Sequence, residues 1–283
     1  MNLDAKPEVF VTGFEAPEGP SFRRDGWLFF VDFEAGRVYR AAPDGTVEVV
    51  AEGGRPVGTK FHRDGRLFVC DSTRGLITID SEGSSAVIAE EFEGKRLNGP
   101  NDLTISSKGD IYFTDPRGSS LERPIGDVYC YRADARLELL DSGYALCNGI
   151  AIGPGEEALY VAETYTKRIY RFGLQPDGSL GARDVFVKLE GGLGPDGMAF
   201  DAAGNLYVAH WGKGCIAVFD PEGAMLGELP TIGEKPSNIA FWNDTIYVTE
   251  VQEGQVVRID VGVTGLQVYG LMDEDTRRES TLV

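Results

Sequence analysis

Short apolar strands separated by polar turns recur along the whole chain. Most of the clearest strands follow a glycine turn, such as Asp25-Gly26 or Asp64-Gly65, and all of them end on a polar or acidic residue. They span 27–32, 67–71, 111–115, 159–163, 206–210 and 246–250. Aromatic and β-branched residues dominate these segments, as is typical of strands joined in hairpins. No segment has the periodicity of an amphipathic helix, so the pattern predicts an all-β protein.

These strands belong to a unit that repeats six times, at intervals of roughly 40 to 50 residues, the spacing of propeller blades. Third strands are expected at 37–40, 75–80, 127–131, 168–172, 215–219 and 255–259. Fourth strands are expected at 47–50, 86–89, 137–140 and 185–189. We therefore predict one domain over residues 1–283, a six-bladed β-propeller of four-stranded antiparallel blades that begin near 18, 57, 101, 148, 196 and 237.

A ring of blades must be closed, because an open ring would expose strand edges. Two segments compete for the last place in the sixth blade: residues 8–13, which precede the first blade, and residues 267–269, which follow the sixth. The charged tail 272–283 is expected to be a frayed terminus.

Composition narrows the classes of function. The net charge of −18 argues against a nucleic-acid surface, which needs clustered Lys and Arg. The chain has no long apolar run and no basic-then-apolar leader, so we expect no membrane partner and a cytoplasmic location. Four cysteines without CxxC spacing are expected to be reduced and buried: Cys70, Cys130, Cys147 and Cys215. Two histidines are too few for a zinc site of the multi-histidine type.

One position of the repeat carries chemistry that the strand pattern does not require. The first residues of the six units are Glu18, Val57, Asn101, Asn148, Asp196 and Ser237. A propeller brings equivalent positions together around its central channel, so the four oxygen donors among them are expected to converge. Such carboxylates and amides suit one divalent cation, Ca²⁺ first, with Mg²⁺, Mn²⁺, Fe²⁺ or Zn²⁺ as alternatives. The opposing interpretation is that these side chains only cap turns.

Local motifs at this position add a resemblance. The most specific are Glu18-Gly19-Pro20, residues 96–102 (RLNGPND), Asn148-Gly149-Ile150 with 159–164, and residues 195–198 (PDGM). Through these motifs, residues 8–270 resemble the gluconolactonase, regucalcin and senescence-marker family of six-bladed propellers, which includes diisopropyl fluorophosphatase.

The resemblance implies a single divalent ion and a sugar-derived lactone as substrate. The resemblance implies that the ligands of this ion are Glu18, Asn101, Asn148 and Asp196. The chain departs from animal members of the family, which have an Arg where Gly99 stands. Arg96 lies further back in this chain and is a candidate for binding lactone hydroxyls, together with Asn101.

The polar residues that end the second strands form another repeated set: Asp32, Asp71, Asp115, Glu163, His210 and Glu250. We expect them to accept hydrogen bonds from backbone amides of neighbouring loops. His210 differs from the others in chemistry, and we name it as a further candidate for substrate contact or proton donation. Asn98 and Asp102 flank Asn101 and are expected to orient it.

The favoured function is metal-assisted hydrolysis of a lactone. Asp196 is the candidate general base, and Glu18 is the ligand that balances charge. No Gly-x-Ser-x-Gly motif is present, which disfavours a serine hydrolase. Two alternatives remain open: an organophosphate hydrolase of the diisopropyl fluorophosphatase type, and a binding propeller that only holds a structural ion.

Overall fold

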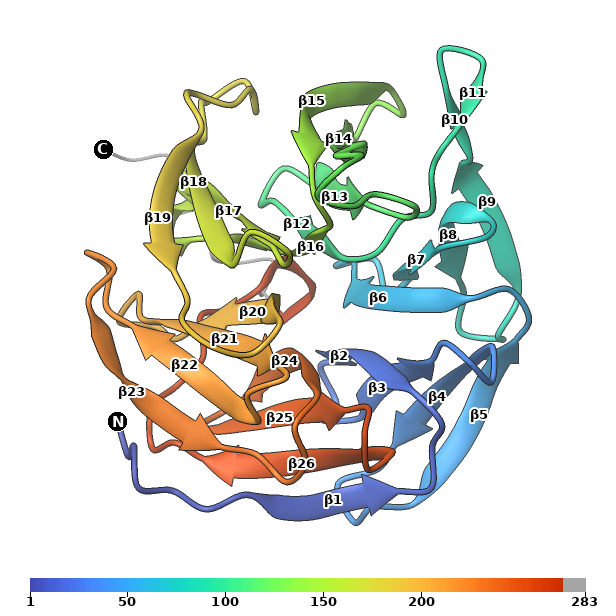
Figure 1. The fold of residues 1–283 in the computed structure, drawn as a ribbon. Coiled ribbons are helices and arrows are strands. Elements are labelled where there is room, and N and C mark those ends of the chain that lie inside the picture. The colour runs from blue at the N-terminus through green and yellow to red at the C-terminus, as the bar shows by residue number, and fades with distance from the viewer. Residues whose placement is uncertain (272–283) are drawn as a thin grey trace, which may run out of the picture.

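The computed structural model describes residues 1–271, so the tail 272–283 lies outside the described residues. Six four-stranded antiparallel sheets stand around a central channel, as Figure 1 shows. The prediction of an all-β, six-bladed propeller is therefore confirmed. Two short 3-10 helices, η1 (Pro154–Glu156) and η2 (Tyr269–Leu271), are the helical elements of this part of the chain. Within it, no helix is long and apolar enough to cross a membrane.

Each blade runs outward from an inner strand at the channel. Blade one comprises β2 (Pro17–Phe22), β3 (Leu28–Asp32), β4 (Arg37–Ala41) and β5 (Val47–Glu52). Blade two comprises β6 (Pro56–Phe61), β7 (Leu67–Asp71), β8 (Gly75–Ile79) and β9 (Ser85–Ala89). Blade three comprises β12 (Leu103–Ile105), β13 (Ile111–Asp115), β14 (Gly126–Tyr131) and β15 (Leu137–Tyr144).

The remaining blades follow the same plan. Blade four comprises β16 (Cys147–Ile152), β17 (Ala158–Glu163), β18 (Arg168–Gly173) and β19 (Asp184–Lys188). Blade five comprises β20 (Gly194–Phe200), β21 (Leu206–Trp211), β22 (Cys215–Phe219) and β23 (Met225–Pro230). Blade six comprises β24 (Pro236–Trp242), β25 (Thr245–Glu250), β26 (Gln255–Asp260) and β1 (Glu8–Thr12). A small hairpin, β10 (Glu91–Phe92) with β11 (Lys95–Arg96), precedes blade three.

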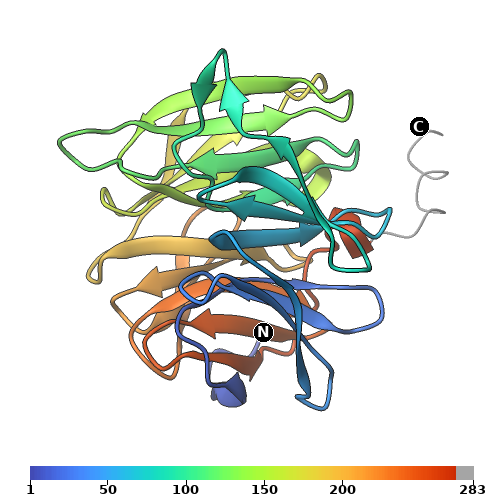
Figure 2. The ribbon, with the colours of Figure 1, turned by 90° about the vertical axis from the view of Figure 1, so that its right-hand side faces the viewer.

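The N-terminal strand closes the ring. Strand β1 pairs antiparallel with β26, from Glu8 opposite Arg258 to Thr12 opposite Gln255. The expectation for residues 8–13 is thus confirmed, and the competing strand at 267–269 is wrong. The edge of β26 is already taken by β1, and the chain after it crosses to one face of the ring, where η2 lies in Figure 2. There, residues 266–271 line a largely apolar cavity at the ends of the inner strands.

Within residues 1–271 the core is divided into six apolar clusters, and each lies between two neighbouring blades. The second strands, β3, β7, β13 and β17, are buried at every residue because both of their faces contact a neighbouring blade. This explains why their sequences are continuous apolar runs without alternation. Each fully buried Val, Leu, Ile or Phe side chain stabilises such a core by about 1.5–3 kcal/mol.

The inner strands are irregular at the position that the repeat analysis singled out. Register shifts occur in five of them: between Glu18 and Ser21 in β2, and at the equivalent points of β6, β16, β20 and β24. In blade three, β12 begins only at Leu103, just after Asn101. A bulge bends a strand and changes the direction of its side chains. Because of the repeated bulge, side chains at the start of these inner strands do not follow the regular alternation between the two faces of the sheet.

Candidate metal centre

Three of the residues predicted to bind metal are buried together at the channel. Glu18, Asn148 and Asp196 occupy the bulges of β2, β16 and β20 and are 4%, 7% and 6% exposed. The side-chain amide of Asn148 donates a hydrogen bond to the Asp196 carboxyl group. The Nδ2 atom of Asn148 also donates to Thr164 Oγ1 at 3.2 Å. Because the amide N–H groups are used in this way, the Asn148 side-chain oxygen is the atom that remains for an ion.

The carboxylates at the channel repel one another. Burial raises the pKa of Asp196 well above its ordinary value, and the charges of Glu18 and Asp102 raise it further. The pKa of Glu18 is also raised, first by burial and then by the charge of Asp102. Lys60 opposes this effect in Glu18 and Asp102, because its positive charge lowers the pKa of both. Several buried acidic groups that repel each other form a site where a cation is electrostatically favoured.

Asn238, which the sequence analysis did not select, links two of these carboxylates. Its Nδ2 atom donates to Glu18 Oε2 at 3.2 Å and to Asp102 Oδ2 at 3.3 Å. Asp102 in turn accepts from the backbone N–H groups of Leu103 and Ile150. These hydrogen bonds hold one face of Glu18 in place.

The sequence did contain a signal for Asp102 and Asn238. Both stand one residue after the repeated donor position, where the other four blades have Gly19, Gly58, Gly149 and Gly197. A Cβ atom on Gly58 would lie 2.7 Å from Asp102 Oδ1, and one on Gly197 would lie 2.1 Å from Asn238 Cγ. The channel thus has room for two side chains at this level, and the four glycines leave that room.

Buried hydroxyl groups join the blades around the site. Thr114 Oγ1 donates to the Asn148 carbonyl at 2.7 Å, and Thr164 Oγ1 donates to the Pro195 carbonyl at 2.8 Å. Ser237 Oγ donates to the Pro17 carbonyl at 3.0 Å. Each acceptor belongs to, or directly precedes, a residue of the donor position in the next blade. The hydroxyls therefore fix the backbone that carries Glu18, Asn148 and Asp196.

Asn101 and Arg96 take different places. Asn101 is half-buried beside Asp102, and its backbone N–H donates to the Thr114 carbonyl at 2.8 Å. Arg96 is exposed on the β10–β11 hairpin, where Nη2 donates to the Thr73 carbonyl at 2.9 Å. Asn98 donates its side-chain N–H to the carbonyls of Asp115 and Ile125. The roles of Asn101 and Arg96 in binding stay predictions.

The residues that end the second strands behave as expected where they are acidic. Asp32 accepts from the backbone N–H groups of Glu15, Ala16 and Ala35. Equivalent bonds to loop amides are made by Asp71, Asp115, Glu163 and Glu250. The sixth member, His210, instead lies near Cys215 and Glu228, and its predicted role in substrate contact stays a prediction. All four cysteines are free and buried, which confirms the expectation for the thiols.

Known proteins share this sequence and this architecture. Diisopropyl-fluorophosphatase of Loligo vulgaris is 32% identical over 89% of this chain and 91% of its own length. Lactonase drp35 of Staphylococcus aureus strain MW2 is 35% identical over 81% of this chain and 74% of its own length. The solved structure of a gluconolactonase from Xanthomonas campestris superposes with a TM-score of 0.82 and 28% identity, covering 91% of this chain and 90% of the other.

The family model described as SMP-30/Gluconolactonase/LRE-like region matches residues 16–252, which span all six inner strands from β2 to β24. The match includes Glu18, Asn101, Asn148 and Asp196. Together with the propeller fold and the two curated relatives, it establishes that the chain belongs to the SMP-30/gluconolactonase/LRE-like family.

Proposed function

We propose that the protein is a metal-dependent hydrolase that opens a sugar-derived lactone. The observation that carries this proposal is the pair of buried carboxylates, Glu18 and Asp196, at equivalent positions of two blades: burial raises the pKa of both, and the charge of Glu18 raises that of Asp196 further. The names of two relatives, lactonase drp35 and the Xanthomonas gluconolactonase, support the substrate class.

The donor set fits a hard divalent cation. Glu18, Asp196, Asn148 and Asn101 offer oxygen atoms only, which Ca²⁺ prefers, and Mg²⁺, Mn²⁺, Fe²⁺ or Zn²⁺ are alternatives. These four residues would hold the ion, and its charge would offset the repulsion among the carboxylates. When bound, such an ion polarises the carbonyl group of the substrate.

The chain's own residues supply the proton transfers in this proposal. Asp196 accepts the proton of the attacking water at a carboxylate oxygen, while the water oxygen adds to the lactone carbonyl carbon. The ring C–O bond then breaks, and the proton passes to the leaving alkoxide oxygen. Burial and the charges of Glu18 and Asp102 raise the pKa of Asp196 in the protein without an ion; a bound cation would lower it again and keep the carboxylate ionised, as a general base requires. The hydrogen bond from Asn148 orients the carboxylate, and Glu18 contributes fixed negative charge.

Asn101, Arg96 and His210 are the proposed contacts to the substrate. Asn101 is next to the carboxylates, whereas Arg96 projects from an exposed hairpin. Of the three, Asn101 therefore has the position that best suits contact with a lactone in the channel.

A second candidate is the hydrolysis of phosphorus–fluorine or phosphoester bonds. The 32% identity to diisopropyl-fluorophosphatase over 89% of the chain favours it. The same carboxylates can serve an attack on phosphorus. A third reading, a binding propeller with a structural ion, is distinguished from both by the absence of turnover.

The test is a panel of sugar lactones and one organophosphate assayed on metal-stripped protein. Ca²⁺, Mg²⁺, Mn²⁺, Zn²⁺ and Fe²⁺ are added back one at a time, and spontaneous opening is subtracted. We expect chelation to remove lactone hydrolysis and one of these ions to restore it. Activity that persists after verified metal removal would exclude the metal-dependent mechanism. Turnover of the organophosphate alone would favour the second candidate, and no turnover by a folded, metal-loaded protein would favour a binding propeller.

A further inference from the structure

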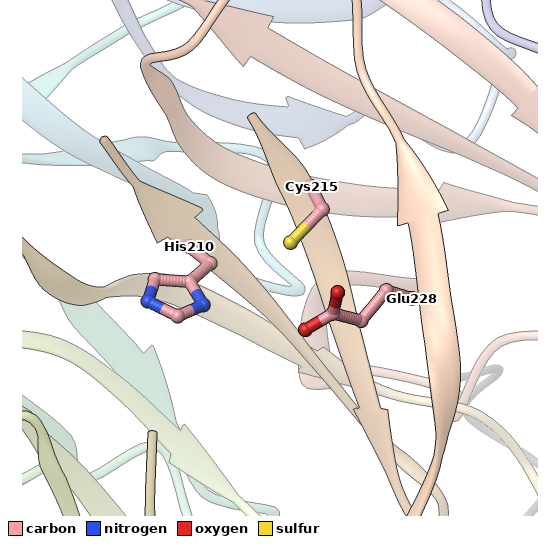
Figure 3. Close-up of side chains that lie close together, drawn as sticks. All are labelled: His210, Cys215 and Glu228. Atoms are coloured by element: carbon pink, nitrogen blue, oxygen red, sulfur yellow. The ribbon is translucent and has the colours of Figure 1, made fainter. Parts of the chain in front are cut away.

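Three side chains of blade five with metal-binding chemistry lie together and do not belong to the central set of oxygen donors. They are His210 at the end of β21, Cys215 at the start of β22 and Glu228 on β23, as Figure 3 shows. Strand pairing explains the cluster. His210 lies opposite Cys215, and Glu228 lies opposite Ala217, which shares a sheet face with Cys215. One donor atom from each residue lies within 4.8 Å of the other two.

The imidazole of His210 is oriented as a metal ligand would be. Its Nε2 atom lies 3.2 Å from the Gly191 carbonyl oxygen, which only an N–H can satisfy. The proton is therefore on Nε2, and Nδ1 has a free lone pair. In Figure 3 one ring nitrogen faces Cys215 and Glu228 and the other points away from them. Metal-bound histidines commonly donate their second ring N–H to a backbone carbonyl in this way.

The Nδ1 atom of His210 is buried and has no hydrogen-bond partner among residues 1–271. The residue is 1% exposed, and leaving such a buried acceptor unsatisfied destabilises the fold. Burial lowers the pKa of His210, so the ring stays neutral and the lone pair stays available near pH 7. A purely structural role does not explain this unpaired nitrogen. The five acidic residues at the equivalent positions of the other blades all accept hydrogen bonds from loop amides, whereas His210 Nδ1 accepts none from residues 1–271.

We propose that His210 Nδ1, Cys215 Sγ and a carboxylate oxygen of Glu228 form a binding site for a Zn²⁺-class ion. One nitrogen, one sulfur and one oxygen donor suit a borderline metal in tetrahedral coordination, with water as the fourth ligand. Binding replaces the thiol S–H bond by an S–metal bond and releases the proton to solvent. The Glu228 side chain is 33% exposed, which gives the ion and the water a path from outside.

Lys213 is the group that competes with the ion. Its Nζ atom pairs with Oε1 of Glu228, which leaves Oε2 for a metal. The Lys213 side chain is 34% exposed, so it can turn toward solvent when an ion enters. The proposed site shares no ligand with the central set, and its donors include sulfur and nitrogen whereas the central set has oxygen only; His210 would then hold an ion in place of the substrate contact proposed for it above. The two sites should therefore select different metals.

The experiment uses Co²⁺ as a spectroscopic probe on the full chain after chelation. A Co²⁺–thiolate bond gives a charge-transfer absorption that oxygen ligands do not give. We expect this band in the wild-type protein, its loss on adding Zn²⁺, and its absence in Cys215→Ser. Cys130→Ala, which removes a buried thiol from blade three, is the matched control and should keep the band. Absence of the band in the wild-type protein, or its persistence in Cys215→Ser, would overturn the proposal.

Two further variants cover other outcomes. Glu228→Gln changes a partly exposed residue and should not disturb folding, so it decides the matter if Cys215→Ser fails to fold. We expect Glu228→Gln to weaken Zn²⁺ binding by at least about 10- to 100-fold. This is the usual loss when a hydrogen-bond partner of a metal ligand is removed, and in the proposed site Glu228 is itself a ligand. Unchanged Zn²⁺ affinity in Glu228→Gln would contradict the assignment. Asp196→Asn should keep the thiolate band, and loss of the band there would show that it depends on the channel carboxylates and would contradict the assignment to blade five.

Discussion

Two sets of acidic side chains surround the channel, and they differ in how their charge is balanced. Asp71, at the end of a second strand, is fully buried, and burial alone would raise its pKa. Hydrogen bonds from Thr73, Arg74 and loop amides nevertheless bring that pKa below its ordinary value. Asp196, on an inner strand, is also buried, but it faces Glu18 and Asp102, so its pKa is raised well above the ordinary value.

The comparison shows that burial and residue type do not by themselves identify a functional carboxylate. Asp71 and Asp196 are both buried aspartates at a repeated position of the blade. Asp71 is surrounded by N–H donors and stabilises a loop, whereas Asp196 is surrounded by the like charges of Glu18 and Asp102. The partners of the carboxylate, not its depth, separate the structural set from the site.

The largest predicted effect tests this separation directly. We expect Asp196→Asn to lower kcat for lactone hydrolysis by about 10²- to 10⁴-fold, because the amide can still coordinate but cannot accept a proton. Asp32→Asn, the matched change in the other set, should mainly lower the melting temperature. Both variants are assayed at saturating metal, with metal occupancy measured on the same samples. If Asp196→Asn keeps near wild-type turnover with metal bound, Asp196 is not the base.

Asp115 ends a second strand, as Asp71 does, but its pKa is raised whereas that of Asp71 is lowered. Burial raises its pKa from 3.8 to about 6, although Asn98 and Gly99 donate backbone N–H groups to it. Folding therefore favours its protonated form. Its contribution to stability is fully present below pH 3.8 and is lost as the pH rises through about 6. The difference amounts to roughly 3 kcal/mol, at 1.36 kcal/mol per pKa unit.

Urea unfolding between these pH values checks the prediction. Relative to Asp115→Asn, the wild-type protein should lose free energy of unfolding as the pH rises. The pKa of Asp71 is lowered, so its contribution has the opposite sign: it is present above the ordinary pKa and is lost as the pH falls. Asp71→Asn should therefore cost more at neutral than at acidic pH. Parallel pH curves for the two variants would contradict the assignment.

Asn238 donates hydrogen bonds to both Glu18 and Asp102, and its removal should weaken the site. We expect Asn238→Ala to lower Ca²⁺ affinity by about 10- to 100-fold, because Glu18 and Asp102 lose the amide that orients them. Calorimetric titration of metal-stripped protein measures the change. Phe241→Leu, at a half-buried residue toward the other end of β24, is the control, and it should leave affinity close to wild type. Equal loss in both variants would indicate a general disturbance of β24 instead.

The smallest effect concerns the hydroxyl groups between blades. Thr114→Val removes the donor to the Asn148 carbonyl and should cost about 1 kcal/mol of folding free energy. Thr245→Val, at a half-buried threonine of blade six, is the control and should cost less. Denaturant unfolding gives both values. A Thr114→Val protein as stable as wild type would show that this bond contributes nothing measurable.

Much of the fold could be predicted from the sequence because the second strands are buried on both faces. Their apolar runs are continuous, so they stand out from the turns around them. Strand β23 was missed because Gly227 interrupts it and because Met225 and Leu226 are both exposed, which removes the alternation. The hairpin β10–β11 has only two residues in each strand and leaves no periodic signal.

The residues of the candidate sites could likewise be predicted only in part from the sequence. Glu18, Asn148 and Asp196 could be selected because they share a register position, and the structure brings them together at the channel. Asn238 escaped notice because it stands one residue later, at a position that is mostly glycine. Glu228 was out of reach for another reason: it lies on β23, the strand that the sequence pattern did not predict, so its approach to His210 depends on an unrecognised pairing.

The pairing of β1 with β26 has a consequence for how the chain folds. Glu8 and Arg258 are 250 residues apart in sequence and form an ion pair across the closing strands. A contact of such separation forms late, because the entropy of closing the intervening loop must be offset by blades that are already packed. During synthesis β1 leaves the ribosome before blade six and has to wait until β26 has been made. Until then both outer edges are exposed, and this interval is when the protein is most vulnerable to strand exchange with another chain.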